Sequence, residues 1–194
     1  MTRIRRASDT KAAILAAARN RFAAEGYRAA SIRAVARDVG VDAALVVRYF
    51  GSKPGLFAAA TDIALRIPDL TDAPADEHGE RLVAHFLLRW DPGTEEGQVL
   101  LGLLRSAASD AAAAAAMREL FADQLVPALH PLVADPSEVP RRAALVASQV
   151  LGLALARSVL ELPPFEAMPP DVVAATVGAT VQRYLHEPLR PRGG

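Results

Sequence analysis

The stretch SIRAVARDVGVDAALVVRYFGSK, residues 31–53, decides the fold of the N-terminal part of the chain. Ser31 is a favourable N-cap for a short helix in which apolar residues recur every three or four positions, so one face of that helix is expected to be buried. Gly40 ends it, and Asp42 can cap a second helix over residues 43–50. Two short helices around a glycine turn predict a helix-turn-helix.

The second helix is the one expected to read DNA. If Val46, Val47 and Phe50 anchor it, its other side presents small residues near the start, which let a helix approach the floor of the major groove. Basic and aromatic residues near its end would meet phosphates. The predicted DNA-binding residues are Arg3, Arg5, Arg6, Ser31, Arg33, Asp42, Ala43, Ala44, Leu45, Arg48, Tyr49 and Lys53. The alternative is that the motif is only a pair of packed helices in an all-α domain.

Positive charge is concentrated at the N-terminal end. Residues 1–53 hold 11 lysines and arginines against 4 acidic residues, a net charge of +7, and since the whole chain has 22 of each, the remainder carries −7. This segregation is expected for a protein whose head lies against a polyanion, although a solvated charged surface is the alternative. Residues 1–8 are predicted to be a basic arm without structure of its own, which either enters a minor groove or only aids solubility.

The composition predicts an all-α fold. The 194 residues are 52% hydrophobic, which is ample for a core, while aromatic residues make up only 5% and no long run alternates polar with apolar residues. We expect about nine helices. They form an N-terminal three-helix helix-turn-helix domain at residues 1–53, a linker helix at 52–67 and a C-terminal helical ligand-binding and dimerisation domain at 68–194.

The sequence also bears on the cell compartment. The absence of cysteine excludes disulfides and thiolate metal sites. The N-terminus lacks the apolar stretch of a secretion signal, and the longest apolar segment, residues 143–156, is too short to span a bilayer. These features predict a soluble, cytoplasmic protein.

Residues 10–60 resemble the DNA-binding domain of TetR-type repressors. The shared pattern is F-x-x-x-G-Y, then S-I-R-x-V-A, then G-V and finally Y-F-x-S-K-x-x-L-F, with order and residue type agreeing over some fifty positions. The chain departs from the family at Asp42, where serine or threonine is usual, and at Val47, where an aromatic residue is usual. The resemblance implies a linker helix between DNA domain and body, dimerisation through the last two long helices, and release of DNA by a bound ligand.

Two helices near the C-terminus, at about 141–162 and 170–187, are expected to form a homodimer interface. The first repeats small residues at four-residue spacing and is apolar nearly all round, so it needs more cover than one chain of this size supplies. The predicted interface residues are Ala144, Ser148, Gly152, Ala156, Val159, Val173, Val177, Val181 and Tyr184. The alternative is that the helix lies inside the chain's own core.

Helices between residues 77 and 134 can enclose a pocket for a small, mainly apolar effector molecule. The predicted lining residues are His85, Phe86, Trp90, Leu104, Met117, Phe121 and Gln124. Aromatic residues at helical spacing more often pack in a core, and that alternative applies to each of them.

An enzyme is not expected. The four histidines, at positions 78, 85, 130 and 186, are scattered, and no metalloprotease, serine hydrolase or P-loop motif accompanies them. The sequence therefore predicts no catalytic residue, no metal and no cofactor. The remaining alternative to a DNA-binding regulator is a helical adaptor protein without specific DNA binding.

Overall fold

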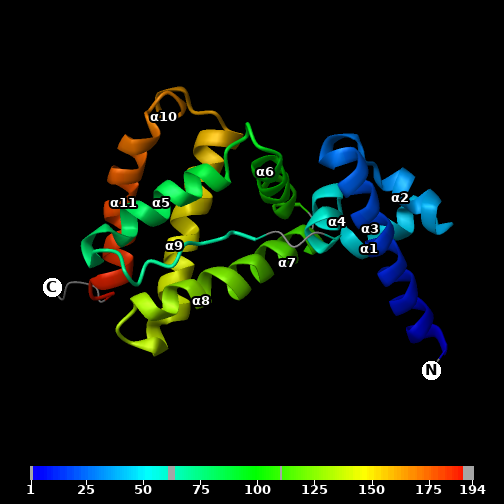
Figure 1. Ribbon diagram of the computed structural model, residues 1–194, viewed down its shortest axis with the longest axis horizontal. Helices are drawn as coiled ribbons and strands as arrows, with labels where there is room; N and C mark the ends of the chain where they lie inside the picture. Colours follow the sequence, from blue (N-terminus) through cyan, green and yellow to red (C-terminus); the bar gives the residue numbers. More distant parts are fainter. Residues whose placement is uncertain (1, 61–63, 110, 190–194) are drawn as a thin grey trace. The chain divides into compact units, whose positions relative to one another are not determined.

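The computed structural model describes residues 2–60, 64–109 and 111–189 (Figure 1). All regular secondary structure in these ranges is helical, as predicted. The chain divides into two compact units, one of residues 1–63 and 102–118 and the other of residues 64–101 and 119–194. The boundary between the units falls inside α6 (Glu95–Ala107) and inside α7 (Ala111–Leu120).

Unit 1 contains the helix-turn-helix. Its N-terminal helices are α1 (Thr2–Ala29), α2 (Ile32–Val39), α3 (Ala43–Phe50) and α4 (Lys53–Ala60). They pack around one apolar cluster that takes residues from all four helices. Its buried members are Ile14, Ala18, Phe22, Ala30, Val35, Ala36, Val46, Phe50, Leu56 and Ala60.

The prediction of an unstructured arm at residues 1–8 is wrong, because α1 already begins at Thr2. Arginine is a good helix former, and neither glycine nor proline interrupts the chain between Thr2 and Glu25. Gly26 has φ 74 and ψ 168, so the regular helix breaks there.

The linker helix is shorter than predicted. Within the described residues α4 ends at Ala60, and residues 64–70 are not helical. Ile63, which the prediction placed in this helix, lies outside the described residues. Arg66 has φ 48, which no α-helix contains, and Ile67 precedes a proline that disfavours helical backbone. The prediction of a helix to Ile67 is therefore wrong over residues 64–67.

Unit 2 is built mainly from α5 (His78–Arg89), α9 (Val139–Ala154) and α11 (Pro170–His186). Figure 1 shows α5 beside α11, and these two helices share the most extensive contact of any pair in the described chain. Short helical elements complete the unit. They are the 3-10 turns Ala75–Glu77, His130–Leu132 and Pro136–Glu138, the π turns Phe121–Leu125 and Leu155–Val159, and the helices α8 (Val126–Leu129) and α10 (Pro163–Glu166).

The helical run Pro136–Val159 is the one candidate for a membrane span within the described ranges. Its 24 residues and mean hydropathy of 1.2 meet the requirement by length and composition only. The core helix of a soluble protein meets the same requirement, and α9, which makes up most of this run, packs against α5 and α11.

Candidate DNA-binding surface and effector cavity

Both helices of the helix-turn-helix start at side-chain caps. The Ser31 Oγ atom accepts a hydrogen bond from the amide of Ala34 (3.2 Å), and Asp42 Oδ1 accepts one from the amide of Ala44 (2.7 Å). Each bond satisfies one of the amides that a helix leaves without an internal partner. The two predicted helix starts are therefore confirmed.

Gly40 makes the turn between α2 and α3. Its φ of 71 and ψ of 33 are left-handed, and the next amide, that of Val41, donates to the carbonyl of Ala36 (3.0 Å). A Cβ atom on Gly40 would meet nothing within 4 Å, so the backbone conformation rather than a lack of space requires glycine.

Arg21 of α1 forms an ion pair with Asp38 of α2. Arg21 donates to both carboxylate oxygens of Asp38, from Nε (2.5 Å) and Nη2 (2.8 Å), and also pairs with Glu25. The hydrogen bond from Arg21 holds the pKa of Asp38 below its usual range, and the same bond raises the pKa of Arg21. This arginine therefore braces the motif, and part of the positive charge counted from the sequence is neutralised locally.

The exposed face of α3 differs from the predicted one at Val47. Val46 and Phe50 are buried, but Val47 is 44% exposed, so the prediction that it anchors the helix is wrong. Val46 and Phe50 are four residues apart and so lie on one face of α3, whereas Val47 is turned by about 100° from Val46 and lies outside the cluster that covers that face. Ala44, Val47 and Arg48 form the exposed face of α3.

The other predicted DNA-binding residues surround this face. Ser31, Arg33 and Asp42 are exposed, whereas Ala43, Leu45, Tyr49 and Lys53 are half-buried. The Arg48 guanidinium lies 5.6 Å from the centre of the Tyr49 ring. The side chains of Arg3, Arg5 and Arg6 lie outside the described part of the structure, so their contact with DNA stays a prediction.

The Lys53 side chain, at the N-terminal end of α4, lies over an aromatic ring. Its Nζ atom lies 4.6 Å from the centre of the Tyr27 ring, which in turn meets the Phe57 ring edge to face at 5.1 Å. Burial lowers the pKa of Lys53 and raises that of Tyr27. The ring fixes a cation beside the positive end of a helix, an arrangement that suits a phosphate.

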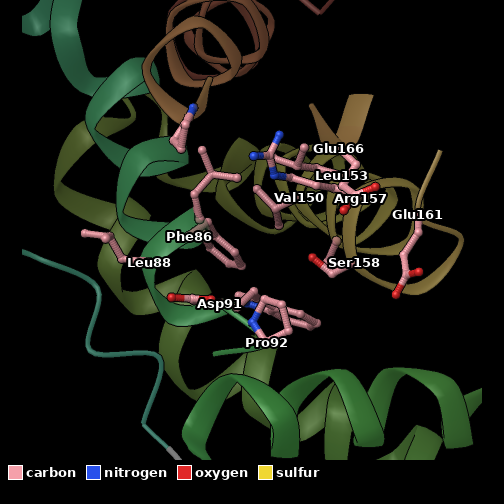
Figure 2. Close-up of a pocket in the computed structure, with 14 residues that line it drawn as sticks. Phe86, Leu88, Asp91, Pro92, Val150, Leu153, Arg157, Ser158, Glu161 and Glu166 are labelled. Carbon is pink, nitrogen blue, oxygen red and sulfur yellow. The ribbon is translucent and has the colours of Figure 1, made fainter. Parts of the chain in front are cut away.

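Unit 2 contains a partly open cavity of about 430 Å³ at the C-terminal ends of α5 and α9, bordered by α10 and the start of α11 (Figure 2). Its apolar lining consists mainly of Phe86, Leu87, Trp90, Pro92, Val150 and Leu153. Its polar lining consists of Asp91, Arg157, Ser158, Glu161 and Glu166. This size and composition are typical of a site for a small organic ligand.

Two features shape the cavity. The Phe86 and Trp90 rings stack with centroids 6.2 Å apart and planes at 22°. Arg157, in the π turn that continues α9, donates from Nη1 to the carbonyls of Phe165 (2.8 Å) and Met168 (2.9 Å). The guanidinium thereby holds α10 and the residues after it against the end of α9.

The comparisons with known proteins agree with this architecture. A family model described as the C-terminal domain of tetracyclin repressor-like proteins matches residues 76–185, which is more than half of the chain. A second model, for bacterial regulatory proteins of the tetR family, matches residues 14–60 and therefore the helix-turn-helix. The chain belongs to the TetR family. It is a DNA-binding transcriptional regulator by family, and TetR-family proteins are regulators rather than enzymes.

Two solved structures of transcriptional regulators resemble the chain over most of its length. A TetR-family regulator from Streptomyces coelicolor A3 is 33% identical with a TM-score of 0.53, and the match covers 92% of this chain and 95% of that one. A transcriptional regulator from Rhodococcus sp. Rha1 shares the fold at 22% identity and a TM-score of 0.52, with 90% and 95% covered. No curated protein of similar sequence was found.

Two of the seven effector-pocket residues predicted for this TetR-family chain, Phe86 and Trp90, line the cavity. His85 Nε2 donates to the carbonyl of Leu65 (2.7 Å), and Gln124 Oε1 accepts from the Leu65 amide (2.5 Å), so both hold the chain after α4. Leu104 and Met117 belong to unit 1, and Phe121 lies half-buried in a π turn. Besides residues 86–92, the cavity is lined by residues between 150 and 170, which the sequence analysis did not assign to it. The charged residues that follow the apolar helix in this range were the sequence feature that could have indicated them.

The predicted dimer residues divide into three groups. Ala144, Ser148 and Gly152 are exposed on α9. Ala156, Val159, Val177 and Tyr184 are half-buried. Val173 and Val181 are fully buried where α11 packs inside the unit, so they are not available to a second copy and the prediction does not hold for them.

Proposed function

We propose that this TetR-family regulator is a repressor that binds a pseudo-palindromic double-stranded DNA operator as a homodimer. The observation that carries the proposal is the exposed face of α3, where Ala44 permits close approach to base edges and Val47 offers an apolar contact. We expect Arg48 on the same face and Lys53 at the next helix start to hold phosphates. The caps at Ser31 and Asp42 support it, because they fix where α2 and α3 begin.

The homodimer rests on the exposed small residues of α9. A Cβ atom on Gly152 would meet nothing within 4 Å, so this part of α9 is open to a close-packed helix of a second copy. A two-fold axis presents two reading helices to one side of a duplex, with half-sites about 34 Å or a multiple of it apart.

Release of the operator is assigned to the cavity of unit 2. A small molecule releases DNA only if it binds one conformation of the dimer better than the other. The effector is a small, largely apolar molecule, since most of the cavity lining is apolar. The protein works in the cytoplasm, where it meets both DNA and the effector.

The experiment is selection of bound fragments from a random duplex pool, followed by gel shifts at two salt concentrations. An enriched inverted repeat, bound with an affinity that falls steeply with salt, supports the proposal. A pool that yields no common sequence, or a binding constant insensitive to salt, would favour a protein-binding adaptor instead.

A further inference from the structure

We infer that the cavity of unit 2 binds an organic cation with a flat apolar body. The inference rests on the proposed function, because it names the chemical class of the effector. It follows from three features of the lining: the charge of its polar side chains, the engagement of its one arginine and its stacked aromatic rings.

Carboxylates dominate the charge of the lining. Asp91 follows α5, Glu161 follows the π turn and Glu166 lies in α10, so they flank the cavity from two sides. None of the three has a lysine, arginine or histidine nitrogen within 4.0 Å among the residues that the structure describes. These carboxylates are therefore not neutralised by a salt bridge within the described chain; all three residues are exposed, and Asp91 Oδ1 accepts a hydrogen bond from the Gly93 amide (2.8 Å).

Arg157 does not cancel this charge in the way a salt bridge would. Its Nη1 group is directed to the carbonyl oxygens of Phe165 and Met168, at 2.8 and 2.9 Å, and the contact organises α10. Three carboxylates and one arginine leave the lining with a formal charge of −2. A cation in the cavity gains from this field, and an anion is repelled by it.

The apolar floor suits the same ligand. Figure 2 shows the Phe86 ring directed into the cavity, with the Ser158 side chain across from it. The Trp90 ring is stacked on Phe86 and is 3% exposed. The face of such rings attracts a cation, and the apolar side chains of Val150 and Leu153 cover the uncharged part of the ligand.

Three probes that differ only in charge test the inference: 6-phenylhexylammonium, 6-phenylhexanol and 6-phenylhexanoate. Trp90 is the only tryptophan of the chain and lines the cavity, so its fluorescence reports occupancy without a label. Calorimetry gives the binding constants independently. We expect the ammonium to bind about tenfold more tightly than the alcohol and the carboxylate to bind most weakly, as expected for two uncompensated charges and an aromatic contact.

The double variant Glu161→Gln with Glu166→Gln removes the charge and keeps the shape. It should weaken ammonium binding about tenfold and leave the alcohol unchanged. Glu80→Gln is the matched control, because Glu80 is exposed on α5 and does not line the cavity. Circular dichroism of each variant establishes that the fold is retained.

The possible outcomes separate this inference from the proposed function. If 6-phenylhexanoate binds most tightly, Arg157 is an anion receptor and the inference is overturned. Equal affinities for the three probes, or a Trp90 fluorescence that none of them changes, would also overturn it. A selected operator that is bound while no ammonium binds overturns the inference alone. Ammonium binding that the double variant loses, in a protein that selects no operator, overturns the proposed function alone.

Discussion

Gly79 and Gly178 bring the backbones of α5 and α11 into direct contact. A Cβ atom on Gly178 would lie 2.6 Å from the Cα atom of Glu80, and a Cβ atom on Gly79 would meet the carbonyl oxygen of Gly178. The Gly79 amide donates to Gln182 Oε1 at 2.7 Å. No side chain separates the two helices at this point, so they pack by their main chains.

The substitution Gly178→Ala should lower the free energy of unfolding by about 3 kcal/mol, because the added methyl group must displace backbone atoms. Gly152→Ala is the matched control. It lies in the interior of α9 with open space around it, and should raise stability by up to about 1 kcal/mol through helix propensity. Urea unfolding at one protein concentration measures both, and equal effects of the two substitutions would contradict the close contact.

Replacing Arg48 with alanine should weaken binding to all duplexes about equally, because a phosphate contact carries no sequence information. Its removal should also reduce the salt slope by about one. Replacing Leu45 or Val47 with a bulky polar residue should instead change which sequence is selected. If the preferred site stays the same after both substitutions, α3 is not the reading helix. Arg118→Ala, an exposed arginine of α7, is the control for charge.

Acid should destabilise unit 2 through His186. Its Nε2 lies 3.2 Å from Nδ1 of His78, and burial, then the charges of His78 and Arg142, lower its pKa. Because the folded pKa is below the unfolded value of 6.5, the unfolded chain binds more protons as the pH falls under that value. The contribution is thus complete above pH 6.5 and is lost as the pH falls towards the folded pKa.

The measurement is the urea midpoint between pH 7.5 and pH 5, for the wild-type protein and for His186→Asn. The variant should show a shallower decline below pH 6.5. His130→Asn, an exposed histidine in the 3-10 turn after α8, should decline as steeply as the wild type. If the urea midpoint falls with pH in the same way for all three proteins, His186 does not cause the loss of stability in acid.

The homodimer prediction is tested by Gly152→Leu. A leucine there projects from the exposed side of α9 and should shift the sedimentation coefficient towards that of a monomer. Ala24→Leu, also exposed but on α1, should leave the dimer intact. A dimer retained in both variants would place the interface elsewhere.

Local chemistry made the helix-turn-helix predictable. Ser31, Gly40 and Asp42 act on amides within a few residues of themselves, so their roles could be inferred from adjacent sequence alone. Val47 was misassigned because apolar residues nearly fill the short α3, and the sequence does not say which of them the core of unit 1 covers. Only the contacts of Val46 and Phe50 decide that.

Contacts distant in sequence account for the other errors. Residues 64–67 are not helical, and there the backbone of Leu65 is bound by His85 and Gln124, which are 20 and 59 residues away. The cavity likewise joins the end of α5 to residues more than 55 positions later. Arg142 is buried and donates a hydrogen bond to the backbone carbonyl of Tyr184, and nothing in the neighbouring sequence indicates this contact. No local pattern encodes these pairings.

The π turn Leu155–Val159 has a consequence for the wall of this cavity. A π turn holds one residue more than an α turn. One extra residue in a continuous α-helix would turn the following chain by about 100° about the helix axis. The π turn takes up such a residue in a wider turn, so the chain after it, which includes Glu161 and α10, leaves α9 on nearly the same side. Arg157 lies within this turn and donates from there to the carbonyls of Phe165 and Met168. The wider turn therefore lets the cavity wall hold one additional residue without redirecting the chain that follows.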